Sequence, residues 1–114
     1  MTTRSCVRPV RLALTLMGLF STTLPALAHN PIAECSVVEG ATIECRGGFS
    51  DGSGAAGVTL DVISYDEQVL VPGKLDDDSK LRFKRPEGEF YILFDAGPGH
   101  VVEIDYHDVD GLKP

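Results

Sequence analysis

The sequence predicts an all-β domain, a Greek-key β-sandwich of about seven strands. Short runs rich in β-branched and aromatic residues alternate with glycine, proline and aspartate turns roughly every 8 to 12 residues, which is typical of a sandwich. No segment carries a helical period over three turns. The expected organisation is a cleaved leader at residues 1–28 followed by a single domain at 29–114.

The first 28 residues have the pattern of a Sec-type signal peptide. Three arginines make its beginning positive: Arg4, Arg8 and Arg11. An apolar run of about 13 residues follows, well short of the roughly 20 that span a bilayer, and Ala26-Leu27-Ala28 forms an A-x-A cleavage site. Cys6 lies away from that site, which argues against a lipoprotein. We therefore expect a periplasmic or secreted domain that begins at His29 and is not inserted in the membrane.

Loss of this leader would make the domain strongly acidic. It would remove three of the ten basic residues and none of the 17 acidic ones, which leaves a formal charge of −10. This charge disfavours nucleic-acid binding and favours cations or basic surfaces as partners, unless it serves solubility alone. A domain of this size has a modest core that covalent or metal support would stabilise.

The first strands are predicted to form a hairpin closed by a disulfide. Residues 29–34 should form an extended arm, and the β-rich runs 35–38 and 42–46 flank a turn at residues 39–41. If Val38 opposes Thr42, the count outward places Cys35 opposite Cys45, close enough for a bridge. An even number of cysteines in an oxidising compartment also favours a disulfide, and thiolate ligation of a metal is the alternative.

The rest of the domain reads as turns and strands. Residues 47–54 are dense in turn formers and predict a loop. Five further strands are expected at or around these positions: 58–65, 68–71, 81–83, 90–94 and 100–106. The run 90–94 is apolar on both faces, as in a central strand. Three successive aspartates at 76–78 suggest calcium, but they lack the EF-hand spacing, so a solvated turn is expected instead.

Several of these motifs resemble the carboxypeptidase regulatory-like, transthyretin-like β-sandwich superfamily. They are Phe49-Ser50-Asp51-Gly52, Ala56-Gly57-Val58, Leu75-Asp76-Asp77, Leu81-Arg82-Phe83 and Glu89-Phe90-Tyr91. A histidine directly after the leader and the motif at residues 95–100 resemble small periplasmic proteins associated with nickel and cobalt uptake. This resemblance implies metal contacts at His29 and His100, and delivery of the metal to a membrane transporter component.

The histidines are the candidate metal ligands. An N-terminal histidine offers a free amine and an imidazole, which hold few protons that a metal must displace at neutral pH. Nitrogen ligands of this kind favour copper and nickel over magnesium or calcium, and the resemblance adds cobalt. Pro31 has no N–H, so backbone chelation would stop before it. A further donor would come from His100 or His107, which on one regular strand would lie roughly 23 Å apart on opposite faces. Nearby carboxylates could assist: Asp95, Asp105 and Asp108.

The sequence also allows one alternative function, and it argues against an enzyme. A surface histidine beside a turn needs no metal, so the alternative function is a non-catalytic interaction or structural module that docks through a strand edge or the loop at 49–57. An enzyme is not expected, because no Ser-His-Asp arrangement is recognisable, the cysteines are used in a bridge and the carboxylates are scattered over turns.

Overall fold

The computed structural model describes residues 3, 18–19 and 29–113; apart from residues 3, 18 and 19, the expected leader and its cleavage site lie outside this part. Seven strands and one 3₁₀ helix form the domain: β1 (Pro31–Glu39), β2 (Thr42–Phe49), β3 (Thr59–Ser64), β4 (Val69–Val71), β5 (Lys80–Lys84), β6 (Phe90–Asp95), β7 (Val101–Asp105) and η1 (Tyr106–Asp108). The predicted all-β class is confirmed. Among the described residues no helix is both long and apolar enough to cross a membrane.

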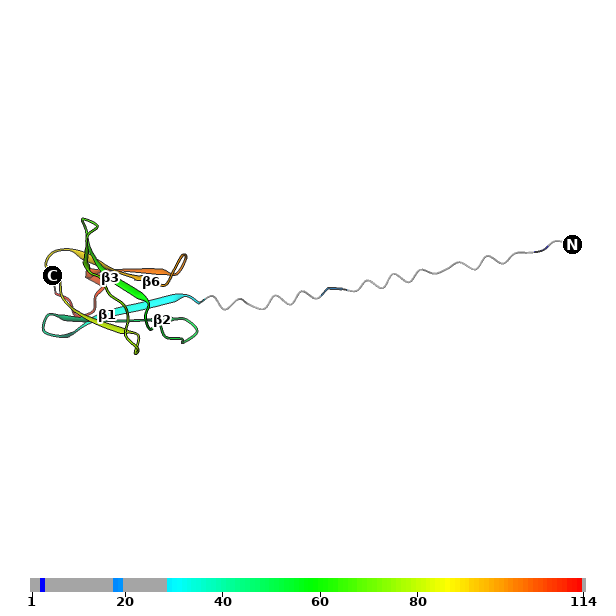
Figure 1. Cartoon of the computed structure of the whole chain (residues 1–114), viewed down its shortest axis with the longest axis horizontal. Coiled ribbons are helices and arrows are strands. Elements are labelled where there is room, and N and C mark those ends of the chain that lie inside the picture. Colours follow the sequence, from blue (N-terminus) through cyan, green and yellow to red (C-terminus); the bar gives the residue numbers. More distant parts are fainter. Residues whose placement is uncertain (1–2, 4–17, 20–28, 114) are drawn as a thin grey trace.

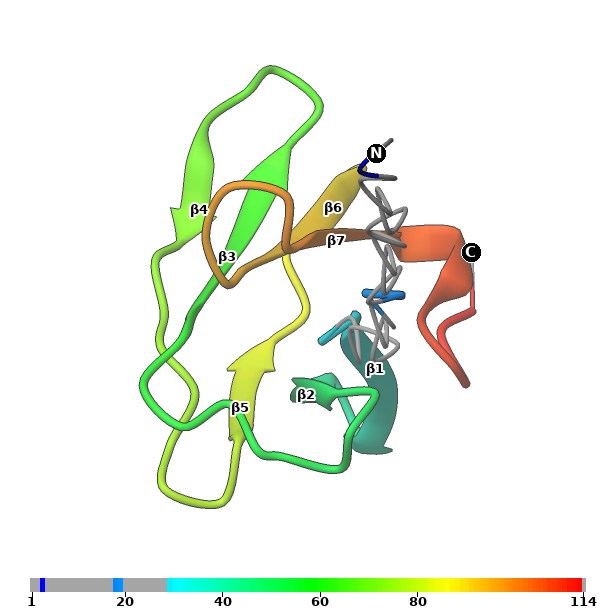
Figure 2. The ribbon, with the colours of Figure 1, turned by 90° about the vertical axis from the view of Figure 1, so that its right-hand side faces the viewer.

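The strands form two antiparallel sheets that pack as a sandwich. One sheet has the order β1-β2-β5 and the other β4-β3-β6-β7, and Figures 1 and 2 show them as two layers. The chain changes sheet after β2, after β4 and after β5, which gives the Greek-key connections that the sequence predicts. Strand β6 lies between β3 and β7, so the prediction of a central strand is confirmed.

Alternating apolar residues build the core between the sheets. The largest side chains without solvent exposure come from β2, β3 and β6: Ile43, Cys45, Leu60, Val62, Phe90, Ile92 and Phe94. Burial of such a side chain contributes about 1.5–3 kcal/mol. Gly47 gives the core room at the end of β2, because a Cβ there would lie 2.6 Å from Leu75 Cδ1 and 2.6 Å from Phe94 Cε2.

The hairpin of β1 and β2 carries the predicted disulfide. Cys35 opposes Cys45 with their Cα atoms 4.1 Å apart, the spacing of a non-hydrogen-bonded pair. The predicted partner of Val38 is wrong: Glu39 opposes Thr42, and the register shifts at Val38. The reason is that Gly40, with φ +55°, allows a two-residue turn, so the residue left over is accommodated as a bulge in β1.

Both strands of this hairpin are longer than predicted. The expected arm at 29–34 is strand from Pro31 onward, and the expected loop at 47–54 begins only after Phe49. The two extensions pair with each other, Pro31 opposite Phe49, which outweighs the poor strand propensity of proline and glycine. At the other end of the chain, β7 begins at Val101 rather than His100 and stops at Asp105.

A hydrogen bond ties the turn after β3 to the end of β7. Tyr65 Oη donates to Asp105 Oδ1 at 2.5 Å, and the second carboxylate oxygen accepts from the backbone N–H of His107 at 3.2 Å, which caps η1. The hydrogen bond to Asp105 raises the pKa of Tyr65 to about 12. The same bond lowers the pKa of Asp105.

We expect Asp105→Asn to return the pKa of Tyr65 toward 10, because the amide carries no charge but still caps η1. An NMR titration of the tyrosine rings measures this, and Tyr91, whose hydroxyl donates to Glu67, is the internal control. In the native protein, the protonated hydroxyl of Tyr65 stabilises the fold below pH 10, and this contribution is lost as the pH rises toward 12. The ionised carboxylate of Asp105 stabilises the fold at neutral pH, and this contribution is lost as the pH falls through its lowered pKa. A Tyr65 titration that Asp105→Asn leaves unchanged would refute this coupling.

Candidate metal-binding site

His29 and His100 line the same shallow pocket. Its volume is about 240 Å³, and Phe49, Ser53 and Ala96 complete its lining. His29 lies two residues before the start of β1, whereas His100 ends the turn between β6 and β7. Figure 1 shows that turn, in orange, at the same end of the sandwich as the start of β1. The structure therefore brings together the two histidines that the resemblance singled out.

An acidic side chain that sequence analysis missed holds His29. Its Nδ1 lies 2.8 Å from Asp51 Oδ2, and its ring packs edge-on against Phe49 with the centroids 6.2 Å apart. Ser53 donates to the other carboxylate oxygen of Asp51 from its backbone N–H at 3.0 Å and from its hydroxyl at 2.6 Å. These hydrogen bonds, with a smaller contribution from His29, lower the pKa of Asp51 and keep it ionised.

Local backbone contacts place residue 29 beside residue 51. The N–H of Asn30 donates to Ser50 Oγ at 3.0 Å, and the Asn30 carbonyl accepts from the Ser50 N–H at 2.9 Å. These bonds continue the β1–β2 pairing beyond Pro31 and Phe49. Gly52, with φ +88°, then turns the chain so that Ser53 can reach back to Asp51. The loop after β2 is thus folded around the carboxylate that contacts His29.

The ring of His100 is oriented by its own turn. Its Nδ1 lies 3.1 Å from the carbonyl oxygen of Pro98. Because a carbonyl only accepts, Nδ1 is the donor in this contact. In a neutral ring Nε2 then carries the lone pair, as in a histidine that ligates a metal through Nε2. Among the described residues Nε2 has no hydrogen-bond partner. Gly97 and Gly99 both have positive φ, which lets this turn close tightly.

The other predicted ligands lie elsewhere. His107 is on η1, where its ring stacks on Tyr106 with centroids 3.9 Å apart, and it does not line the pocket of His29 and His100. Asp95 accepts from the N–H of Gly97 inside the turn, and Asp105 is bound to Tyr65. Within residues 29–113 and the few others described, no three His, Cys, Asp or Glu side chains gather into a group able to hold a metal ion.

Two imidazoles and one carboxylate lie at this end of the domain, but among the described residues they do not converge into a metal-binding group. Nitrogen donors of this type favour divalent transition metals, whereas calcium takes six or more oxygen ligands. The cysteines offer no thiolate, because they form the disulfide. Comparison with known proteins finds no matching family model, no matching curated protein and no matching solved structure. The geometry around His29 and His100 is therefore the basis on which function is inferred.

Proposed function

We propose that the processed protein is an exported metal-binding accessory protein that captures nickel, cobalt or copper at its N-terminus and passes it to a membrane transporter component. The observation that supports this most is the shared pocket of His29 and His100, two residues far apart in the sequence. The proposal includes no catalytic step. It depends on cleavage after Ala28, which would free the α-amine of His29.

The freed amine would supply the donor that the side chains lack. Together with Nδ1 of His29 it forms a two-nitrogen chelate, and His100 offers Nε2 as a third nitrogen. Nδ1 now donates a proton to Asp51, 2.8 Å away, so a bound cation would take the place of that proton and keep the carboxylate as a neighbouring negative charge. In the uncleaved chain the α-nitrogen of His29 belongs to a peptide bond and cannot bind a metal as a free amine does, so the precursor would bind weakly.

The exposure of the site suits transfer of the metal. The side chain of His29 is 58% exposed, and the pocket is shallow, so a partner's ligands can reach a bound ion directly. A carrier needs this access, because an ion enclosed by the protein would leave only after the fold opened. Copper should bind most tightly of the three metals, as expected for nitrogen ligands.

The decisive experiment compares the protein that begins at His29 with one that retains Ala28. Isothermal titration with Cu²⁺ and with Ni²⁺ should show affinity that is roughly hundredfold lower when Ala28 is retained, about 2.7 kcal/mol. His100→Gln and Asp51→Asn should also weaken binding, whereas His107→Gln, an exposed histidine outside the pocket, should not. Equal affinity with and without Ala28, or a mature protein that starts at another residue, would refute the proposal.

A non-catalytic interaction module remains the second candidate, and one observation favours it. Within the described part of the chain, the outer edge of β1 is only partly covered, since the C-terminal segment pairs with it at Ser36 alone. Exposed strand edges bind extended segments of other proteins. The groove along this edge is lined by neither His29 nor His100, so the two functions are compatible.

A further inference from the structure

The uncovered part of β1 is its first half. Val37 donates its N–H to the Asp110 carbonyl at 2.8 Å, and the Asp110 N–H donates to the Cys35 carbonyl at 3.0 Å. The backbone groups of Cys35 and Val37 therefore point away from β2, and by strand alternation those of Ala33 do too. Among the described residues, neither Ala33 nor the Cys35 N–H has a backbone partner on this side. They form a template to which another strand can pair.

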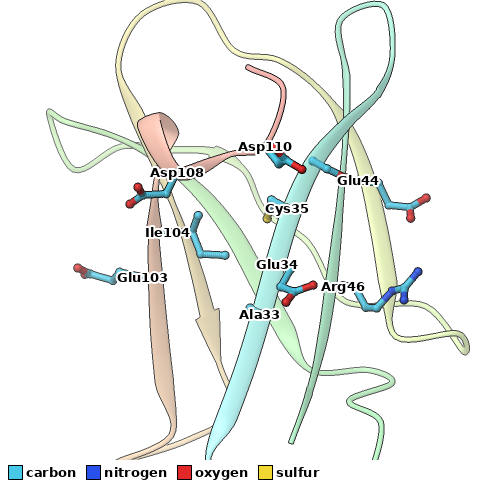
Figure 3. A pocket seen from close by; sticks show the side chains of 10 residues that line it. Ala33, Glu34, Cys35, Glu44, Arg46, Glu103, Ile104, Asp108 and Asp110 are labelled. Atoms are coloured by element: carbon cyan, nitrogen blue, oxygen red, sulfur yellow. The ribbon is translucent and has the colours of Figure 1, made fainter. Parts of the chain in front are cut away.

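This edge opens onto a groove with a volume of about 560 Å³. One wall comes from β1, the other from β7 and η1, and the segment of Asp108 and Asp110 closes one end, as Figure 3 shows. The apolar residues on the two sides are Ala33 and Ile104. The groove thus offers both backbone hydrogen-bonding groups and some apolar surface.

The rim of the groove is strongly negative. Four of its carboxylates form no ion pair with any described residue: Glu34, Glu103, Asp108 and Asp110. A fifth, Glu44, is paired with Arg82 at 2.7 Å, and Arg46 is the one basic residue that lines the groove among those described. A ligand of positive charge is therefore favoured, and a second copy of this acidic chain is not.

We propose that an extended segment of a partner protein, with lysine or arginine at alternate positions, adds as a strand beside Ala33 and Cys35 and places its basic side chains against Glu34, Glu103 and Asp108. Main-chain hydrogen bonds to β1 supply part of the affinity, and the carboxylates select the charge. The inference does not depend on metal binding, because the groove contains neither His29 nor His100.

Fluorescence anisotropy tests this with the protein that begins at His29, in low salt and with a chelator present. The probes are three labelled hexapeptides: one alternating lysine with valine, one alternating glutamate with valine, and the lysine peptide methylated at its central backbone nitrogens. We expect only the first to bind. The double variant Glu34→Gln/Glu103→Gln should weaken that binding roughly tenfold, as expected from the loss of two exposed charge pairs. The matched control, Asp77→Asn/Asp78→Asn, removes the same charge from an exposed turn and should leave binding unchanged.

Each other result would overturn the proposal. Binding of the methylated peptide with equal affinity would show that charge acts without strand addition. Equal loss of binding in the two double variants would show a general effect of net charge rather than a site. Sedimentation that detects self-association of the protein, lost in Glu34→Gln/Glu103→Gln, would assign the edge to a second copy. None of these results bears on the metal titration, so the two proposals fail separately.

Discussion

Replacement of Phe94 by alanine should lower the free energy of unfolding by about 3–5 kcal/mol. Phe94 has no solvent exposure, lies on β6 between β3 and β7, and faces β2 of the other sheet. Its ring contacts Phe49 at a centroid distance of 6.3 Å, and its edge fills the space that Gly47 leaves open. The neighbours belong to paired strands and cannot collapse into the cavity, which places the loss toward the upper part of this range.

Equilibrium unfolding in urea, with the disulfide intact, measures the loss as a lower midpoint at unchanged slope. Leu93→Ala is the matched control. Leu93 immediately precedes Phe94 in β6, but its side chain points to the other face of the sheet and is only half-buried. We expect a clearly smaller loss for this control. An equal loss in the two variants would contradict the assignment of the core to the face that carries Phe94.

Removal of the disulfide should have the second-largest effect. The double variant Cys35→Ala/Cys45→Ala should lose about 3 kcal/mol, the value expected for a bridge that closes a loop of this length. The cysteines are ten residues apart, and both are buried, 6% and 0% exposed, so the alanines also leave a small cavity. The cost is large for a domain of this size, whose total stability is of the order of 5–15 kcal/mol.

Thermal unfolding followed by circular dichroism measures this second effect, and we expect the midpoint to fall by about 10–25 °C. The native protein in the presence of a reductant is the comparison, since it loses the bridge but keeps the sulfur atoms in the core. It should unfold between the native protein and the double variant. Identical midpoints for all three samples would show that hairpin pairing alone stabilises β1.

The disulfide was predictable because the hairpin is local. Alternation and a short turn place Cys35 opposite Cys45, and an error at Val38 did not spread, since the bulge lies on the turn side of the bridge. The same register, continued outward, pairs Pro31 with Phe49 and would set His29 opposite Asp51. That contact could have been found by counting. It was missed because a proline in β1 and two glycines in β2 have low strand propensity, so the sequence did not predict that these strands extend from the cysteines toward His29 and Asp51.

The meeting of His29 with His100 could not be derived from strand patterns. It requires the turn after β6 to lie at the same end of the sandwich as the start of β1, and these strands belong to different sheets. Periodicity indicates which face of a strand is buried, but the packing of two sheets decides which turns become neighbours. The sequence offered this pair only as a hypothesis, from the expected resemblance and from the glycine-rich turn beside His100. The groove beside β1 could not be predicted either, because it depends on how much of the outer edge of β1 the C-terminal segment covers.

The cross-link between β1 and β2 also has a consequence for the order of maturation. One register runs from Cys35 and Cys45 to Pro31 and Phe49 at the open end of the hairpin, so oxidation of the sulfurs fixes the strand that follows His29. If the N-terminus binds a metal as proposed, translocation and trimming would expose the amine, thiol oxidation would lock its position, and loading would come last. In a compartment that left the thiols reduced, the amine would be exposed but the disulfide would not hold it in position.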